Sequence, residues 1–323
     1  MTTQLAKAAS RTRTPGPGRH RPRWYAALVV MAALLLAAVL AGHRLVPNVY
    51  SAGSLLDSVA PLFGLAVPVL VLAALAARSR AALLTVALPA AVWAAQFGGA
   101  LLPPQGGPAE LRVVSQNLYA DNPDPAATVE ALAADGPDLI AIQEATEGVA
   151  ETAAERLRES YPYRAVKGTV GLLSKHPIAQ VSSLDSRTSW IRGLRAVVET
   201  PQGDVAVYVA HLRSARINET ASRDRNIQAL ADAVRGDDAS RVLVLGDLNT
   251  SAEDRAFAPL SALLRDAQAD AGWGFGLTWP SALPVLRPDQ VLYRGLTATD
   301  AGVLRTPGTD HRAVTSSFAF PTG

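Results

Sequence analysis

Two kinds of hydrophobic pattern divide the chain at about residue 110. The first part contains three long apolar runs, at residues 24–42, 59–77 and 81–102. Each run holds close to the ~20 residues that a helix needs to cross the hydrocarbon core of a bilayer. A cleaved signal peptide followed by buried helices is the alternative, but the first run is too long for the apolar region of a typical signal peptide and no small-residue cleavage site clearly follows it. We therefore predict three transmembrane helices.

Beyond residue 110 the apolar runs are short and rich in β-branched residues, as in buried strands. Residues 194–200 and 204–212 are two such runs, and the Pro and Gly between them predict a hairpin. We also expect strands at residues 111–118, 137–144, 168–174, 241–249, 289–294 and 312–318, and helices at residues 125–134, 146–159 and 223–234. Helices mixed with adjacent strands favour an α+β domain in which sheet packs on sheet with helices outside.

Charge is distributed as unevenly as hydrophobicity. Of the 30 Lys/Arg and 28 Asp/Glu, residues 1–109 hold nine basic residues and a single acid, Asp57. Six of these basic residues precede the first apolar run, and Arg78 and Arg80 lie between the second and the third. Since cytoplasmic loops carry excess positive charge, we expect the N-terminus and the turn around Arg78 in the cytoplasm. Everything after residue 102 is then expected outside the cell.

These assignments give the domain organisation. Residues 1–22, rich in Pro and Arg, are predicted to be a disordered cytoplasmic tail. Residues 103–109 include PPQGGP and are predicted to be a linker, because proline cannot continue a helix. Residues 110–323 form the extracellular domain, which has six more acidic than basic residues. The absence of cysteine excludes disulfides and cysteine-ligated zinc, so this domain depends on its own core.

Polar residues stand where the predicted strands end. Strand ends hold side chains on a rigid rim, so several of them can converge on one site. Each residue has an ordinary explanation by itself: His211 can be a hydrogen-bonded core residue, and Asp247 with Asn249 can form an Asx-turn. Together, and in this order, they predict a catalytic site made of Asn117, Glu144, His211, Asp247, Asn249, Asp289, Asp310 and His311.

The order of these residues resembles that of the endonuclease/exonuclease/phosphatase superfamily, which includes DNase I, abasic-site endonucleases, neutral sphingomyelinases and inositol-phosphate phosphatases. The resemblance covers residues 110–320 and rests on QN at 116–117, QE at 143–144, HL at 211–212, GDLN at 246–249, Asp289, and TDH at 309–311. It implies a four-layer αββα sandwich, preceded here by three transmembrane helices.

The resemblance also implies a hydrolase that cleaves phosphate esters with a hard divalent cation, Mg²⁺ or Mn²⁺. Glu144 is then the main metal ligand, and Asn117 and Asp310 complete or support the metal site. Abasic-site endonucleases carry an aspartate two residues after the position of Asn117, where this chain has Tyr119. This departure makes the site less acidic and weakens the analogy with nucleases.

The remaining site residues are assigned to proton transfer and phosphate binding by the same resemblance. Asp289 orients His311, which acts as a general base or stabilises the transferring phosphoryl group. Asp247 and Asn249 position the attacking water and a phosphate oxygen. His211 donates to another phosphate oxygen, where charge develops during the reaction.

Three features favour a lipid substrate. The short linker keeps the site near lipid headgroups, the acidic excess disfavours DNA, and the compact domain leaves little room for insertions that grip a duplex. Three spans followed by such a domain also resemble the actinobacterial VanJ-type family, linked to teicoplanin resistance and to dephosphorylation of undecaprenyl pyrophosphate. We therefore expect the bilayer and a phosphorylated lipid as partners, with nucleic acid less favoured. The alternatives are an extracellular membrane-anchored nuclease and a catalytically silent binding protein of the same fold.

Two further groups have two interpretations each. Four arginines either bind a pyrophosphate or headgroup, or form a solvated helix face paired with Glu219 and Asp224: Arg213, Arg216, Arg223 and Arg225. Three aromatic residues either form an apolar wall near the site or belong to the core: Trp273, Phe275 and Trp279.

Overall fold

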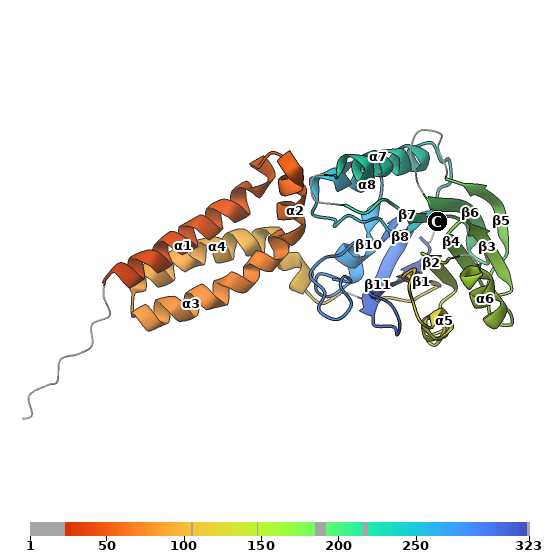
Figure 1. The fold of residues 1–323 in the computed structure, drawn as a ribbon, viewed down its shortest axis with the longest axis horizontal. Helices are drawn as coiled ribbons and strands as arrows, with labels where there is room; N and C mark the ends of the chain where they lie inside the picture. Colours follow the sequence, from red (N-terminus) through yellow and green to blue (C-terminus); the bar gives the residue numbers. More distant parts are fainter. Residues whose placement is uncertain (1–22, 105, 147, 185–191, 216–218, 322–323) are drawn as a thin grey trace, which may run out of the picture.

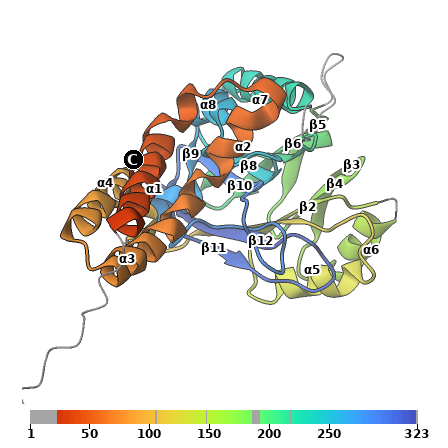
Figure 2. The ribbon, with the colours of Figure 1, turned by 60° about the vertical axis from the view of Figure 1, so that its left-hand side comes forward.

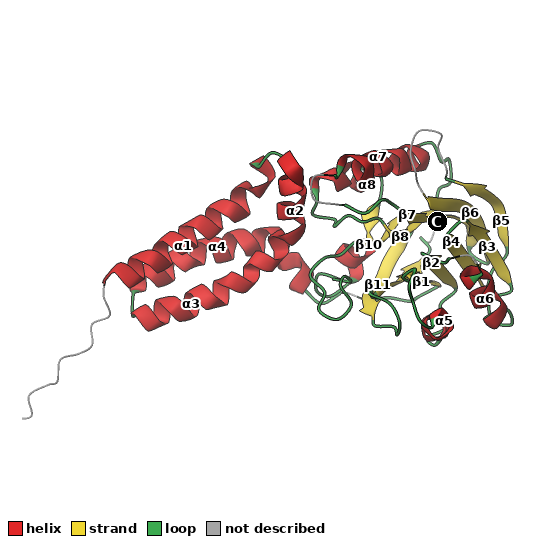
Figure 3. Cartoon of the chain, in the orientation of Figure 1, coloured by secondary structure: helices red, strands yellow, loops and turns green. Residues whose placement is uncertain are grey.

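The protein consists of a helical bundle followed by a β-sandwich (Figure 1). The computed structural model describes residues 23–104, 106–146, 148–184, 192–215 and 219–321. The predicted tail at residues 1–22 and Arg216, one of the four arginines with two interpretations, lie outside the described residues. Strands are confined to the C-terminal part, and the N-terminal part is helical (Figure 3).

Two six-stranded sheets make up the sandwich in the described part of the chain. The first has the order β11 (Thr297–Leu304), β12 (Ala313–Ala319), β1 (Leu111–Asn117), β2 (Leu139–Gln143), β4 (Val170–Ser174), β3 (Tyr163–Lys167). The second has the order β5 (Ile178–Ser183), β6 (Arg192–Thr200), β7 (Gly203–His211), β8 (Val242–Asp247), β10 (Asp289–Arg294), β9 (Arg265–Asp266). The β1–β2 and β7–β8 pairs are parallel, and the other pairs are antiparallel. In each parallel pair, the C-terminal ends of the two strands therefore lie at the same rim of the sheet.

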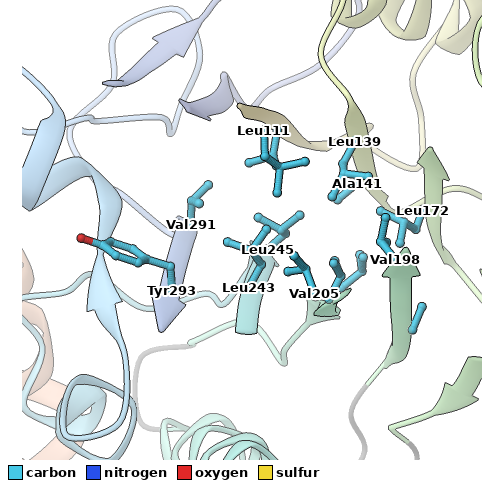
Figure 4. Packing of buried hydrophobic residues seen from close by; sticks show 14 of the residues in the cluster. Leu111, Leu139, Ala141, Leu172, Val198, Val205, Leu243, Leu245, Val291 and Tyr293 are labelled. Atoms are coloured by element: carbon cyan, nitrogen blue, oxygen red, sulfur yellow. The ribbon is translucent and has the colours of Figure 1, made fainter. Parts of the chain in front are cut away.

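Helices cover the outer faces of both sheets. The helices of the sandwich are α5 (Pro125–Ala133), α6 (Val149–Arg156), α7 (Ala221–Arg235), α8 (Ala258–Ser261) and α9 (Ala267–Ala271). Helices α5 and α6 bury Leu132 and Ala153 against the first sheet, and α7 buries Ile227 against the second. Between the sheets lies a third core, in which Leu111 and Leu139 face Leu245 (Figure 4). The predicted four-layer αββα sandwich is confirmed.

Most predicted strands and helices of this domain are present, but the described chain also has elements that the sequence did not predict. The predicted strand at 168–174 is one arm of a hairpin, because Gly168 takes a left-handed conformation and turns the chain between β3 and β4. Strands β5, β9 and β11 are additional edge strands. Their residues are largely polar or small, so they lack the apolar run that marks a central strand.

Three segments of the described chain are long and apolar enough to cross a membrane: Trp24–Leu45, Val49–Ala77 and Arg80–Leu101. Their helices are α1 (Arg23–Gly42), α2 (Ala52–Val59), α3 (Ala66–Ala77) and α4 (Arg80–Phe97). Small residues line the contacts between the helices, since Ala33, Ala74 and Ala82 are fully buried. Large apolar side chains face outward, and Leu35 and Leu84 are 66% and 76% exposed. Such a surface is suited to lipid rather than to water.

The second apolar segment begins earlier than the predicted residue 59. Helix α2 covers part of the sequence between the first two predicted spans, and it lies between the bundle and the sandwich (Figures 1 and 2). The charge of Asp57 interrupts the apolar run in the sequence, which is why the pattern placed the boundary there. In the folded chain Asp57 is fully buried, so its charge does not prevent helix formation.

An ion pair holds α2 against the sandwich. Arg255 donates to both carboxylate oxygens of Asp57, through Nε at 2.6 Å and Nη2 at 3.0 Å, and His43 Nδ1 lies 2.7 Å from Asp57 Oδ1. Arg255 also donates to the carbonyl oxygens of His43 and Val46. The guanidinium of Arg255 lies against Gly53. Any side chain at position 53 would place its Cβ 2.7 Å from that guanidinium. The sandwich is therefore docked onto the bundle and not held by the linker alone.

Removing the charge of Asp57 tests this docking. Asp57→Asn leaves the guanidinium of Arg255 without its carboxylate, and we expect the free energy of unfolding to fall by about 2 kcal/mol. The matched control is Asp135→Asn, which changes an exposed aspartate of the sandwich. The measurement is the thermal unfolding midpoint of the full chain in detergent. Equal midpoints for the two variants would show that the ion pair does not stabilise the docked arrangement.

Candidate active site

The predicted site residues meet at one rim of the sandwich. Asn117 ends β1, Glu144 follows β2, and His211 ends β7. In the second sheet Asp247 is paired in register with both His211 of β7 and Asp289 of β10. Asp310 and His311 precede β12, which neighbours β1. The rim therefore combines polar side chains from both sheets, as the strand-end pattern predicts.

Asn117 joins two of the carboxylates. Its Nδ2 donates to Glu144 Oε1 at 3.1 Å and to Asp247 Oδ2 at 3.0 Å, while its Oδ1 accepts from the backbone N–H of Tyr119. Glu144 adopts a left-handed conformation with φ 53°, and its Oε2 accepts from the N–H of Ala120. Non-glycine residues in this region cost about 1–3 kcal/mol each and cluster at functional sites. In this arrangement Asn117 supports the carboxylates through its nitrogen.

The two histidines approach the same carboxylates from the second sheet and from the end of the chain. His211 Nε2 lies 3.6 Å from Glu144 Oε1 and 3.9 Å from Asp247 Oδ2. His311 Nε2 also lies 3.9 Å from Asp247 Oδ2, and its Nδ1 is 2.8 Å from Asp289 Oδ2. Asp247 is thus the centre of the site, and both imidazoles point a nitrogen at it.

The charge of His311 is set by its surroundings. Burial by itself lowers the pKa of an imidazole, but the carboxylates of Asp289, Asp247 and Asp310 outweigh it and raise the pKa of His311 to about 10. Thr278 Oγ1 donates to the same oxygen of Asp289 at 2.5 Å and fixes that carboxylate. His311 is therefore an imidazolium at neutral pH, oriented by Asp289.

Asn249 is held by the loop that follows β8. Its backbone N–H donates to Asp247 Oδ1 at 2.8 Å, and its Nδ2 donates to the carbonyl of Leu212 at 3.0 Å. The residue has φ 48°, a second strained position in the site. Gly246 precedes it with φ 146°, and a Cβ there would lie 1.9 Å from the carbonyl oxygen of Ala210. Only glycine fits where β8 passes this close to β7.

The sequence allowed Arg223 to bind a headgroup or to lie on a solvated helix face. In the structure it has a structural role instead. Its side chain is buried and pairs with Asp224 at 2.7 Å and with Asp254 at 2.9 Å. It also donates to the carbonyl of Asn249 at 3.3 Å, so it supports the strained loop of the site. The expected pairing with Asp224 is present, but the helix face is not solvated at this residue. Arg225 is exposed.

The three aromatic residues lie at the boundary with the bundle. Trp273 donates from Nε1 to the carbonyl of Leu101, and the ring of Phe275 packs edge-on against Trp93 at 6.1 Å. Trp279 donates to Asp310 Oδ2 at 3.1 Å. Only Trp279 therefore borders the site, and none of the three is a core residue. Their partners lie far away in sequence, so no local pattern indicates these contacts.

A divalent cation fits the chemistry of this rim. Four carboxylates face two imidazoles, which leaves excess negative charge in a partly closed space. The carboxylates of Asp247 and Asp289 lie within 4.8 Å of His311 and are buried with it. Glu144 and Asp310 are only partly buried and border the open cavity, so their oxygens are accessible to a cation. Oxygen donors of this kind are those that Mg²⁺ and Mn²⁺ prefer.

The site opens into a cavity of about 550 Å³. Glu144, Asp247, Asn249, Asp310 and His311 line one side of it. The other side is formed by the membrane part of the chain, between residues 50 and 58. Sequence analysis did not predict this second wall, because most of it lies between the first two predicted spans, where no pattern indicates a contact with the sandwich.

Comparison with known proteins agrees with this geometry. Residues 114–311, more than half of the chain, match the profile of the Endonuclease/Exonuclease/phosphatase family. Comparison with curated protein sequences gave no match.

Solved structures with the same fold cover the sandwich but not the bundle. D. rerio TDP2 in complex with a single-strand DNA product is 17% identical with a TM-score of 0.54, covering 65% of this chain and 98% of its own. The 3′ phosphatase NExo from Neisseria, bound to a product DNA hairpin, is 17% identical with a TM-score of 0.52, covering 65% and 100%. Beta toxin from Staphylococcus aureus is 17% identical with a TM-score of 0.51, covering 64% and 99%.

At this level of identity the structures establish the shared fold alone. The profile match spans every candidate site residue from Asn117 to His311. Together with the αββα sandwich, it shows that the protein belongs to the endonuclease/exonuclease/phosphatase family.

Proposed function

We propose that the protein is a divalent-metal-dependent phosphohydrolase that cleaves the phosphate ester or pyrophosphate of a membrane lipid. The observation that carries this proposal is the shared cavity, in which the family's site residues face a wall made by the membrane part. A phosphate bound at Glu144 and His311 in this cavity lies in the same space as residues 50–58. A substrate anchored in the bilayer is already at that position.

The orientation follows from the distribution of basic residues. Arg78 and Arg80 lie in the turn between α3 and α4, at the end of the bundle far from the sandwich (Figure 1). The N-terminus of α1 lies at the same end. Since positive residues remain in the cytoplasm, the catalytic domain is assigned to the outer face of the membrane.

Each site residue has a separate role in the proposed hydrolysis. Water attacks phosphorus, the bond to the leaving oxygen breaks, and the proton of the water passes to a base. Asp247 is suited to orient that water and accept its proton, and Asn249 holds the carboxylate of Asp247 through its backbone N–H at 2.8 Å. His211 Nε2 faces the same space and donates to a phosphate oxygen. His311, as an imidazolium, stabilises charge on the transferring phosphoryl group.

Glu144 and Asp310 would hold the metal, with Asn117 supporting Glu144. When bound, Mg²⁺ or Mn²⁺ would neutralise charge on the phosphate and on the leaving oxygen. Asn117 bridges Glu144 and Asp247 by donating to one oxygen of each. Trp279 donates from Nε1 to Asp310 Oδ2 and orients that carboxylate.

A lipid pyrophosphate such as undecaprenyl pyrophosphate fits both the position and the charge of the site. Its headgroup lies at the bilayer surface, and its two phosphates carry the negative charge that a metal and His311 offset. A nuclease is the second candidate, but residues of the membrane part line the cavity of this site, which favours a substrate at the bilayer. The acidic excess of residues 110–323 also opposes binding to DNA.

Replacing Glu144 tests the proposed metal-dependent hydrolysis. Glu144→Gln keeps the shape of the side chain but removes the charge that binds the cation. We expect phosphate release from undecaprenyl pyrophosphate, by the full chain in detergent with Mg²⁺, to fall by roughly 100-fold or more. Chelation of the metal should have a similar effect on the unmodified protein. Glu159→Gln, which alters an exposed glutamate of the same domain, serves as the control. Undiminished release by Glu144→Gln would refute the assignment.

The pH dependence tests the role of His311. Since its pKa is raised, the imidazolium is present below pH about 10 and is lost as the pH rises through that value. Asp289→Asn removes an attractive charge, so the pKa of His311 falls. We expect the alkaline limit of kcat to move down by about 1–3 pH units. Asp135→Asn should leave the profile unchanged. An alkaline limit unaltered by Asp289→Asn would show that His311 does not act as an imidazolium.

A further inference from the structure

The wall opposite the catalytic residues is apolar and exposed. Within the described chain, Tyr50 and Leu55 line the cavity and are 75% and 54% exposed. Trp279 and Leu286 lie on the sandwich side of the same cavity. Charged groups thus line one part of the cavity, and apolar side chains line the part next to the bundle. Exposed apolar surface of this kind indicates an apolar ligand or partner.

This wall is fixed in place. Ser54 donates to Asp254 Oδ1 at 3.0 Å and accepts from Arg223 Nη2 at 3.3 Å. One turn along the helix, Asp57 pairs with Arg255. Tyr50 and Ser51 both have positive φ, 55° and 65°, which is an unfavourable conformation for a bulky side chain such as that of tyrosine. A strained segment held by buried hydrogen bonds beside an active site points to a functional constraint on its shape.

The wall also continues into the membrane. Residues 50–58 belong to the same apolar segment, Val49–Ala77, that is long enough to span a bilayer. An apolar chain leaving the bilayer along this segment meets Leu55 and Tyr50 before it reaches the carboxylates. The same chain would have no such path on a soluble domain of this fold.

We propose that Tyr50 and Leu55, together with Trp279 and Leu286, form the binding site for the hydrocarbon chain of a lipid phosphate. The phosphate lies at Glu144 and His311, and the first part of the chain lies against α2 on its way to the bilayer. This inference rests on the proposed function and extends it, because it makes the membrane part a component of the substrate site. It also makes chain length a determinant of affinity, since each buried methylene contributes roughly 0.8 kcal/mol.

A single introduced thiol tests this site without relying on turnover. The chain contains no cysteine, so Leu55→Cys gives one reactive position in the full-length protein. The variant is reconstituted in phosphatidylcholine nanodiscs and treated with a water-soluble maleimide. Farnesyl monophosphate, isopentenyl monophosphate, farnesol, inorganic phosphate and a short single-stranded oligonucleotide are the probes. Val181→Cys, on β5 and 39% exposed, is the control.

We expect farnesyl monophosphate to slow alkylation of Leu55→Cys several-fold and to leave Val181→Cys unaffected. Isopentenyl monophosphate and inorganic phosphate, which lack a long chain, should protect much less. Unchanged alkylation with farnesyl monophosphate would overturn the proposal. Equal protection by farnesol or by inorganic phosphate, or protection by the oligonucleotide instead, would overturn it as well. Tyr50→Cys carries the same test if Leu55→Cys does not fold.

The outcome is separable from that of the proposed function. Protection by farnesyl monophosphate without hydrolysis of any lipid phosphate would support the chain-binding site and refute the hydrolase. Hydrolysis of a lipid phosphate without protection of Leu55→Cys would refute the chain-binding site alone.

Discussion

The ion pair between buried Asp57 and partly buried Arg255 determines how the two parts of this protein work together. It joins the only acid among the first 109 residues to a guanidinium 198 positions later in the chain. A buried pair of this kind adds little net stability, because desolvation offsets attraction, but losing one partner leaves an uncompensated charge. The pair therefore acts mainly as a specificity device that selects one docked arrangement. In that arrangement α2 forms a wall of the active site.

A second set of contacts, a hydrogen-bond network, connects helix α2 to the site. Ser54 of α2 is hydrogen-bonded to Arg223, and Arg223 donates to the backbone of Asn249 and to Thr250. Asn249 in turn donates to Asp247, the residue toward which both histidines point. The geometry of the catalytic loop thus depends on a residue of the membrane part.

Much of the catalytic rim could be predicted from sequence because its residues occupy strand ends. Glu144 and Asp247 follow apolar strands, and the αββα fold brings those ends together, so their convergence is a consequence of the sheet order. The order of the motifs identified the family, which the profile match confirms. The metal-ligand roles of Glu144, Asn117 and Asp310 stay predictions.

What sequence analysis missed depends on contacts between distant segments. Asp57 appeared to end an apolar run, since nothing near it in sequence indicates Arg255. Arg223 appeared to be a surface cation, because its partner Asp254 comes from a separate loop. Thr278 and Trp279 fix Asp289 and Asp310 from a loop that has no regular pattern. Hydrophobic periodicity reports which face of an element is buried, and it does not report which partner covers it.

The central claim is that this site acts on a lipid phosphate and not on nucleic acid. The most direct measurement is a competition in one reaction, with the full-length protein in nanodiscs, Mg²⁺, a long-chain polyprenyl pyrophosphate and plasmid DNA. The account predicts that phosphate is released from the lipid while the plasmid remains intact. Degradation of the plasmid with the lipid unchanged would contradict it.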